Sequence, residues 1–261
     1  MTLPVSVIIP THNSQSTISR ALLSVFAQTK LPSEVIVVDD GSSDSTCDVV
    51  KKIAEIAPCP TRLILLDTNV GPSLTRNTGW DMATQEFIAF LDSDDSWHYE
   101  KLAVQCAWMM AHPECLITGH LTSSTDDKFD ITDIKSRTFD LRDFLIRNRV
   151  STPTVMLRRE ITDRFDSSLW YAEDYELWLR ILHKTQSFVR LEHPLTQLHK
   201  ATFGESGLSS KLFQMYKGEV TAIFLVRSRK QISVGAFSVF IVWKTLKYLL
   251  RIFRTMARQL T

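Results

Sequence analysis

The amino-acid sequence predicts an α/β fold in which a mostly parallel central sheet is covered by helices on both faces, with a helical extension at the C-terminal end. Three observations lead to this fold class. Short apolar runs alternate with segments of helical spacing along about the first hundred residues. Each run is apolar at consecutive positions, as expected of strands buried on both faces. The chain has 261 residues, 44% of them hydrophobic, which is enough for a substantial core.

The predicted elements alternate in chain order. A strand at residues 5–9 precedes a helix that is apolar at positions 18, 22, 25 and 26. A strand at residues 35–38 precedes a helix that is apolar at positions 49, 53 and 56 and has Asp44 as its N-cap. A strand at residues 63–66 precedes a helix that opens with Gly71-Pro72 and reaches about Thr84. A strand at residues 87–91 precedes a helix that is apolar at positions 102, 106, 109 and 110.

The remainder of the chain is less regular. We expect a strand at residues 152–157, a helix at residues 174–184, and short strands at residues 188–191 and 195–199. From about residue 208 onward the apolar pattern is helical.

Composition excludes several classes of protein. Lys and Arg number 30 and Asp and Glu number 29, so no global charge points to nucleic acid. The four cysteines form no C-x-x-C pair, which argues against a zinc site, and we expect reduced thiols that fill the core. Residues 1–6 lack a signal-peptide pattern, and no apolar run reaches the roughly 20 residues that span a bilayer. We therefore expect a cytoplasmic protein.

Polar residues follow three of the predicted strands. In parallel sheets, ligands bind beyond the carboxyl ends of the strands. That rule selects three segments, Thr11-His12-Asn13, Asp39-Asp40 and Asp92-Ser93-Asp94-Asp95. We expect a ligand site where these segments meet.

The most informative segment is the acidic one at residues 92–95. Three carboxylates within four residues repel one another unless a cation neutralises them. Hard cations such as Mg²⁺ and Mn²⁺ prefer these oxygens and keep substrate phosphates as further ligands. A solvated acidic turn that caps the following helix is the structural alternative. The position of the turn directly after an apolar strand favours a metal site.

Three further groups have a structural and a functional interpretation. A carboxylate at Asp39 or Asp40 can accept a hydrogen bond from a nucleotide base N–H or a ribose hydroxyl. Alternatively, it can cap an Asp-Gly turn. Arg76, early in a predicted helix, suits phosphate oxygens, a nearby carboxylate or plain exposure at the surface. Glu173 and Asp174 begin a predicted helix. Acidic residues there can interact with the helix dipole, or one of them can act as a general base.

Taken together, these segments resemble the family 2 glycosyltransferases, which have the fold called GT-A. The resemblance covers about residues 3–200 and depends on five ordered stretches, at residues 5–13, 34–46, 69–79, 90–95 and 173–178. It implies a catalytic domain at residues 1–207. That domain divides into a nucleotide-sugar-binding half at 1–112 and an acceptor-side half at 113–207, followed by a helical extension at 208–261.

The resemblance implies roles for individual residues. Asp174 matches the catalytic base, with Glu173 beside it. Donor-binding positions are Thr11, His12, Asn13, Asp39, Asp40, Arg76, Asp92 and Ser93, with Asp40 reading a uracil-type base and His12 placed to stack on it. Asp92 and Asp94 match a metal-binding D-x-D pair for Mn²⁺ or Mg²⁺, with Asp95 as an alternative ligand and His199 near the metal or acceptor.

The implied reaction is an inverting transfer from a nucleotide diphosphate sugar, most simply a UDP-sugar, to a hydroxyl of an envelope glycan or a lipid-linked acceptor. The Q-x-x-R-W type motif of processive synthases is absent after Asp174, so we expect single additions. A sugar-1-phosphate nucleotidyltransferase would need a Gly-rich basic loop that residues 10–16 lack. A non-catalytic sugar-nucleotide-binding protein is the other alternative, and a turnover assay separates it from an enzyme.

The C-terminal segment carries a basic stripe. Its members are spaced 3, 4, 3 and 4 positions apart, at Lys244, Lys247, Arg251, Arg254 and Arg258. A basic amphipathic helix with aromatic residues is typical of a membrane interface. We expect contact with an anionic membrane surface, peripheral at the cytosolic face. The structural alternative is a terminal helix docked on the domain with its basic side solvated.

Overall fold

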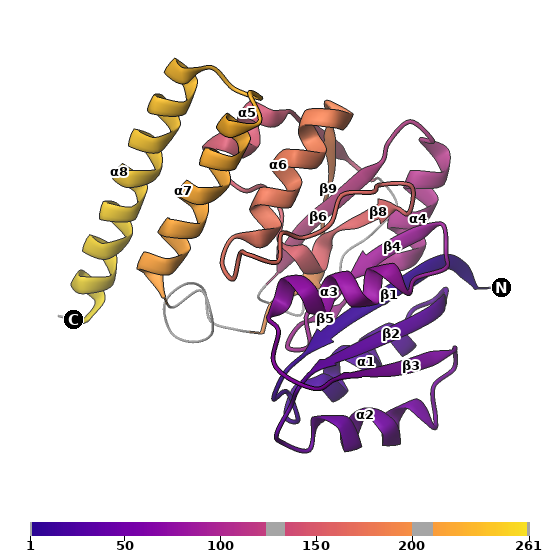
Figure 1. Ribbon diagram of the computed structural model, residues 1–261. Coiled ribbons are helices and arrows are strands. Elements are labelled where there is room, and N and C mark those ends of the chain that lie inside the picture. Colours follow the sequence, from indigo (N-terminus) through magenta and orange to yellow (C-terminus); the bar gives the residue numbers. More distant parts are fainter. Residues whose placement is uncertain (1, 124–133, 200–210, 260–261) are drawn as a thin grey trace.

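The structure, a computed structural model, describes residues 2–123, 134–199 and 211–259 (Figure 1). Its centre is one sheet, which has nine strands in the described part of the chain. The first section is parallel and contains β3 (Thr61–Leu66), β2 (Pro32–Asp40), β1 (Leu3–Thr11) and β4 (Phe87–Phe90), in that spatial order. The predicted alternation of strands and helices is confirmed over this section.

The sheet continues beyond β4 with mixed strand directions. β8 (Met156–Arg158) pairs antiparallel with β4 and with β6 (Ile117–Ser123). β6 runs parallel to β9 (Phe188–Gln197), and β9 also pairs antiparallel with β5 (Ser96–Trp97) and β7 (Ser136–Phe139). The two halves predicted from the sequence therefore share one continuous sheet.

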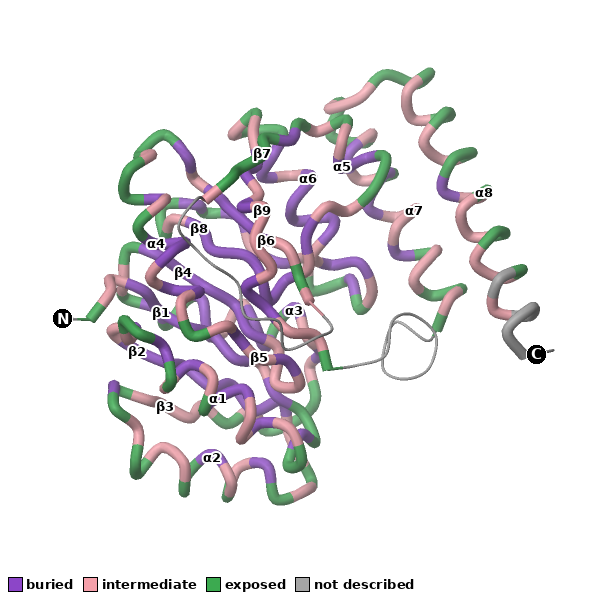
Figure 2. Tube along the Cα trace, turned by 180° about the vertical axis from the view of Figure 1, so that it is seen from behind, coloured by how far each residue is buried: buried purple, intermediate pink, exposed green. Residues whose placement is uncertain are grey.

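Helices cover both faces of the sheet because the strands alternate their side chains between two apolar layers. In β1, Val5, Val7 and Ile9 belong to one layer and Ile8 to the other. The first layer includes apolar residues of α1 (Ile18–Phe26), α2 (Thr46–Ala54) and α4 (Lys101–Ala111). The second includes residues of α3 (Pro72–Asp81), α5 (Leu141–Ile146), α6 (Glu173–Thr185) and α7 (Leu212–Ser228). Figure 2 shows the buried residues concentrated along the central strands.

Several predicted boundaries are wrong for identifiable reasons. Ile56 lies beyond the end of α2 and is 74% exposed, so it is not part of the apolar face. Helix α3 ends at Asp81, and the Thr84 backbone N–H instead donates to the Glu34 carboxylate at 2.7 Å. Asp44 accepts from the Thr46 N–H at 3.0 Å, but the residue at the N-cap position of α2 is Ser45.

The middle of the chain differs from the prediction in two places. Residues 152–157 do not form one strand: Thr152–Thr154 is a 3-10 turn and β8 follows it. Pro153 has no backbone N–H for a strand ladder, which explains the interruption. The two short strands predicted within residues 188–199 are one strand, β9, whose pairing with β6 shifts register near Leu121.

The C-terminal helices pack as a pair at one end of the molecule (Figure 1). These are α7 and α8 (Val234–Gln259), and α7 also contacts α6. Within the described residues, neither α8 nor any other helix is both long enough and apolar enough to cross a membrane.

All four cysteines are free thiols in the structure. Cys59, Cys106 and Cys115 are buried and Cys47 is half-buried. Burial raises the pKa of each thiol, to about 11 for Cys47 and Cys106. A hydrogen bond to the Asp39 carboxylate adds to the shift at Cys47.

Candidate active site

The carboxyl ends of β1, β2 and β4 meet at one edge of the sheet. The register of the parallel strands pairs Thr11 with Asp39, and the Leu91 N–H donates to the Ile8 carbonyl at 3.0 Å. The turns that follow also touch, since the hydroxyl oxygens of Ser14 and Ser93 lie 2.9 Å apart. The fold thus brings together the three polar segments that the sequence singled out.

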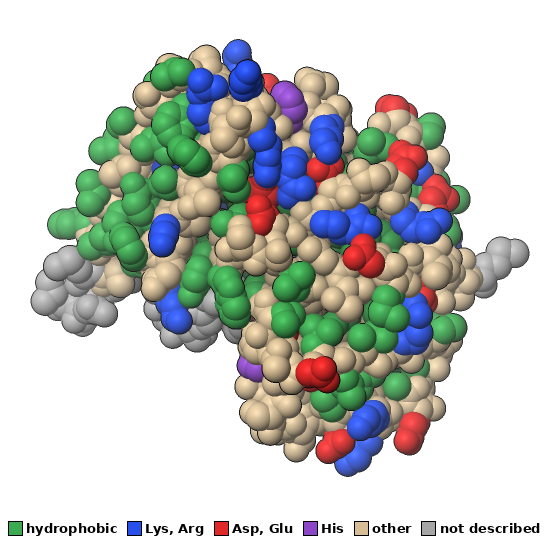
Figure 3. All heavy atoms as spheres, viewed as in Figure 1, with side chains coloured by type: hydrophobic (Ala, Val, Ile, Leu, Met, Phe, Trp, Pro, Cys, Tyr) green, Lys and Arg blue, Asp and Glu red, His purple; other side chains and the backbone are tan. Residues whose placement is uncertain are grey.

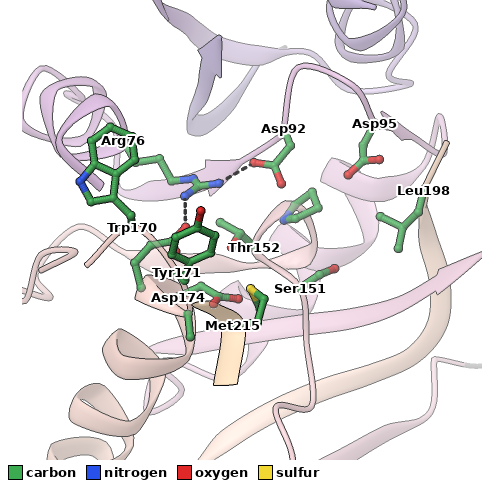
Figure 4. A pocket seen from close by; sticks show the side chains of 13 residues that line it. Arg76, Asp92, Asp95, Ser151, Thr152, Trp170, Tyr171, Asp174, Leu198 and Met215 are labelled. Atoms are coloured by element: carbon green, nitrogen blue, oxygen red, sulfur yellow. Dashed lines mark hydrogen bonds and ion pairs between the residues drawn. The ribbon is translucent and has the colours of Figure 1, made fainter. Parts of the chain in front are cut away.

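A cavity of about 250 Å³ opens at the end of β4 (Figure 4). Its walls come from α3, the turn after β4, the 3-10 turn, the segment that leads into α6, the end of β9 and α7. The lining residues are Arg76, Asp92, Asp95, Ser151, Thr152, Pro153, Trp170, Tyr171, Ala172, Glu173, Asp174, Leu198 and Met215.

Arg76 joins two acidic parts of this cavity. One terminal guanidinium nitrogen donates to Asp92 at 2.9 Å and the other to Glu173 at 2.8 Å (Figure 4). Burial opposes the charge of Arg76, but the Asp92 and Glu173 carboxylates outweigh it and raise the pKa of the guanidinium. The sequence allowed phosphate oxygens, a nearby carboxylate or the solvent as the environment of Arg76, and in the structure its partners are carboxylates. Arg76 is therefore placed to hold Asp92 and Glu173 in fixed positions.

Asp174 has the environment of a general base. Its carboxylate accepts from its neighbour Tyr175 N–H at 2.7 Å and from the Asn148 amide at 3.2 Å. Burial raises the pKa of Asp174 to about 7, and the nearby Glu173 charge adds to this; the hydrogen bonds and Arg76 act in the opposite direction. A base whose pKa lies near the working pH is well suited to proton transfer.

The backbone that leads into α6 and Asp174 is strained. Ala172 precedes α6 with a φ of 56°, in the left-handed region that residues with a side chain seldom adopt. The turn places Ala172, Glu173 and Asp174 together on the cavity wall. Such a conformation costs on the order of 1 kcal/mol or more and is often found at functional sites.

The residues expected to bind the donor base lie outside the cavity lining. Both Asp40 carboxylate oxygens accept backbone N–H groups ahead of α3, from Val70 at 2.7 Å and Gly71 at 3.0 Å. Asp39 accepts from the Ser42 N–H at 2.9 Å and the Ser42 hydroxyl at 2.5 Å. These bonds match the structural interpretation of an Asp-Gly turn, and the base-reading role stays a prediction.

The end of β1 is fixed by the same turn. The exposed His12 donates from Nδ1 to the Asp40 carbonyl at 2.7 Å, and the Asn13 amide oxygen accepts from the Ser43 N–H at 2.9 Å. The Thr11 hydroxyl is buried and has no hydrogen-bond partner within the described part of the chain. Thr11, His12, Asn13, Asp39 and Asp40 are thus adjacent to one another at the carboxyl ends of β1 and β2.

Of the predicted metal ligands, Asp92 and Asp95 line the cavity and Asp94 does not. The Asp94 carbonyl accepts from Arg20 at 2.6 Å. Asp95 is buried and accepts from the His199 backbone N–H at 3.3 Å, while the His199 ring lies 2.7 Å from the Ser96 hydroxyl.

The carboxylates of the cavity are the groups that could hold a divalent cation. No three acidic, histidine or cysteine side chains converge as a complete metal site among the residues that the structure describes. Mg²⁺ is commonly held by one or two carboxylates together with substrate phosphates. Asp92 and Asp95 both line the cavity and supply two carboxylates of the kind that such a cation binds.

Residues that the sequence did not reveal form the rest of the cavity. Trp170 is 47% exposed and its ring lies against Gly71, where an added Cβ would approach the ring to 3.2 Å. Tyr171, Ser151 and Met215 complete this side. The sequence feature that could have indicated this side of the cavity is the pair Trp170-Tyr171, shortly before Glu173 and Asp174, in a stretch without a regular pattern.

Comparisons with known proteins agree with one another. The model of the family described as "Glycosyl transferase family 2" matches residues 6–168. The chain is 32% identical over 178 residues to the Escherichia coli UDP-Glc:alpha-D-GlcNAc-diphosphoundecaprenol beta-1,3-glucosyltransferase WfgD, over 68% of this chain and 69% of that protein.

Two solved structures have a similar fold. S. aureus TarS in complex with UDP-GlcNAc gives a TM-score of 0.69 at 23% identity, over 97% of this chain and 73% of that chain. The mannosyltransferase PcManGT from Pyrobaculum calidifontis, in complex with GDP-Man and Mn²⁺, gives 0.67 at 18% identity, over 98% and 76%.

Proposed function

Because the chain belongs to glycosyltransferase family 2, we propose that it transfers single sugars from a nucleotide diphosphate donor to a hydroxyl of an envelope glycan or lipid-linked acceptor, with inversion. The observation that carries this proposal is the cavity. It holds the acidic turn after β4 and the acidic start of α6 in one space, with Arg76 between them.

The described residues have distinct roles in this reaction. Asp174 takes the proton of the acceptor hydroxyl as that oxygen attacks the anomeric carbon of the donor sugar. The bond from that carbon to the diphosphate oxygen breaks in the same displacement, and the nucleoside diphosphate leaves. Attack opposite to the leaving group inverts the anomeric centre, as in an inverting glycosidase. Arg76 holds Glu173 in place beside the base through their ion pair at 2.8 Å.

A divalent cation, Mn²⁺ or Mg²⁺, would be held by Asp92 and Asp95. When bound it would offset the charge that develops on the departing diphosphate. Asp94 and His199 remain candidate ligands from the sequence. One structural neighbour was solved with Mn²⁺, which supports the metal in this proposal.

The donor and acceptor are proposed from the names of similar proteins. The E. coli relative is named for UDP-Glc and for a diphosphoundecaprenol acceptor. The neighbours were solved with UDP-GlcNAc and with GDP-Man. A UDP-sugar and a lipid-linked acceptor are therefore the first pair to test.

The test is a donor screen with purified full-length chain. Nucleotide release from a panel of UDP- and GDP-sugars is measured with and without Mn²⁺, using membrane lipid extract as the acceptor. We expect release with one donor to depend on the extract and to yield an inverted glycosidic bond. Donor binding without turnover on any acceptor would instead indicate a non-catalytic binding protein.

A further inference from the structure

The outer side of α8 is apolar from Val239 to Phe253. Large hydrophobic side chains recur three or four positions apart and are 42–71% exposed. This outer stripe consists of Val239, Val242, Trp243, Leu246, Leu249, Leu250 and Phe253. Figure 3 shows hydrophobic side chains gathered over this end of the molecule. An apolar surface of this extent is uncommon on a soluble monomer unless it contacts a partner.

The described members of the basic stripe predicted for this helix, Lys244, Lys247 and Arg251, contact other elements of the protein. Lys244 is 3% exposed and its ammonium group donates to Glu219 of α7 at 2.8 Å, and Arg251 donates to the same carboxylate at 3.1 Å. Lys247 donates to the Ile146 carbonyl at 3.1 Å. The prediction of an outward basic side is therefore wrong at Lys244. The side chains of Arg254 and Arg258 lie outside those that the structure describes.

The charge around the outer stripe is strongly positive. Residues 211–261 contain ten Lys and Arg but one acidic residue, Glu219. That residue is engaged by Lys244 and Arg251, so its charge is offset locally. Lys211, Lys217 and Lys230, on or next to α7, are exposed. Arg229, at the end of α7, instead pairs with the buried Glu176 of α6. Two copies of this surface would bring like charges together, whereas an anionic surface would complement them.

Helix α7 connects this surface to the cavity. Met215 lines the cavity, while Phe213, two residues earlier, is 60% exposed. Gly218 lets α7 approach the segment before α6, because an added Cβ would lie 2.4 Å from the Tyr171 carbonyl oxygen. A surface that contacted α7 and α8 would therefore lie close to the acceptor side of the cavity.

From these observations we infer that α7 and α8 form a docking surface for an anionic lipid bilayer, in which the outer stripe of α8 enters the interface. The occupant is lipid because the stripe is apolar and its surroundings are cationic, the two features that bind interfacial helices. The inference goes beyond the transfer reaction and does not depend on it.

Vesicle co-sedimentation of the full-length chain tests this surface. The probe is a set of phosphatidylcholine vesicles with and without phosphatidylglycerol, at low and high salt. The variant carries Leu246→Ser, Leu250→Ser and Phe253→Ser. Its matched control carries Ile56→Ser, Leu65→Ser and Met110→Ser, three similarly exposed residues on other elements. Thermal unfolding and gel filtration confirm that both variants are folded.

We expect the wild type and the control to bind vesicles that contain phosphatidylglycerol. The α8 variant should bind them at least about tenfold more weakly. Equal binding by the α8 variant, or no vesicle binding by the wild type, would overturn the inference. So would a wild-type dimer that the α8 variant converts to a monomer, since a second copy would then be the occupant. Vesicle binding without sugar transfer would contradict the proposed function and leave this surface standing.

Discussion

Asp174 holds its proton more tightly than an exposed aspartate because its carboxylate is desolvated and lies beside Glu173. The folded pKa, about 7, lies above the ordinary value of 3.8. Between these values the folded state binds more protons than the unfolded state. The free energy of unfolding therefore falls as the pH rises through this range, and a neutral side chain at position 174 removes that dependence.

Replacing Asp174 with Asn should leave nucleotide-sugar binding intact and lower the transfer rate about 10²–10⁴-fold, since an amide cannot accept the acceptor proton. Donor binding is measured by calorimetry and transfer by product formation. The wild-type rate should rise with pH up to about 7, as the base ionises. A variant with nearly normal turnover would show that another group is the base.

The same substitution should change how stability depends on pH. Relative to the wild type, Asp174→Asn should gain stability as the pH rises from about 4 to about 7, because only the wild type must ionise a buried carboxyl. Urea unfolding at several pH values measures this difference, and any constant cost of the substitution cancels. A difference that does not change with pH would contradict the environment described for Asp174.

Arg76→Met should destabilise the fold and abolish transfer. It leaves Asp92 and Glu173 close together without their shared cation, and loss of one partner of a buried pair costs about 3–5 kcal/mol. Arg76→Lys keeps the charge but cannot donate to both carboxylates in the same geometry. Lys51→Met, in an exposed pair, is the control and should change the unfolding free energy by about 1 kcal/mol or less.

The pairing of α7 with α8 depends on a charge cluster as well as on apolar contacts. Lys244 is buried against Glu219 and lies 4.2 Å from the centre of the Tyr175 ring. Tyr216 of α7 stacks on Tyr248 of α8, with ring centres 4.6 Å apart. These contacts fix the rotation of α8 about its own axis relative to α7. They therefore determine which side of α8 faces outward.

Glu219→Gln should lower the unfolding free energy by about 3–5 kcal/mol, because it leaves the Lys244 ammonium buried without a charged partner. Adding Lys244→Met should recover much of that loss, since the buried charge is then removed. Chemical denaturation of both variants measures the two effects. Equal unfolding free energies of the single and double variants would show that the Lys244 ammonium is solvated by other groups or by water when Glu219 is replaced.

The sequence was sufficient for elements whose pattern is local. The consecutive apolar residues of β1, β2 and β4 identified buried strands, and the rule for strand ends located the acidic turn at Asp92. The spacing of Lys244 and Arg251 correctly placed them on one side of a helix. It did not show which way that side faces, because the deciding partner, Glu219, belongs to another helix.

The cavity wall that contains Trp170 was not predictable for a related reason. Trp170, Ser151 and Met215 are distant in sequence and meet only through tertiary packing. The sequence was compatible with three environments for Arg76. The fold places it between α6 and the turn after β4, where its partners are carboxylates.

Across the whole molecule, one sheet carries both the segments expected to bind the donor and part of the cavity wall. Its parallel section ends in the segments expected to bind the donor, and the mixed section and α6 supply the opposite wall of the cavity. Changes on one wall should therefore affect one substrate more than the other.

Trp170→Ala tests this separation. The exposed ring offers an apolar face to an acceptor sugar, and its loss should raise the acceptor KM by about tenfold or more. The donor KM should change little, and Leu74→Ala, at another exposed apolar residue on α3, should leave both constants unchanged. A selective rise in the donor KM would place Trp170 on the donor side instead.

The state of the four thiols has a practical consequence for spectroscopy. At neutral pH their raised pKa values leave almost no thiolate to react with maleimides or iodoacetamides. A cysteine introduced at an exposed position, such as Leu246→Cys, would ionise near the ordinary value and react far faster than the native four. A single fluorophore or spin label can therefore be attached to α8 without first deleting any native cysteine.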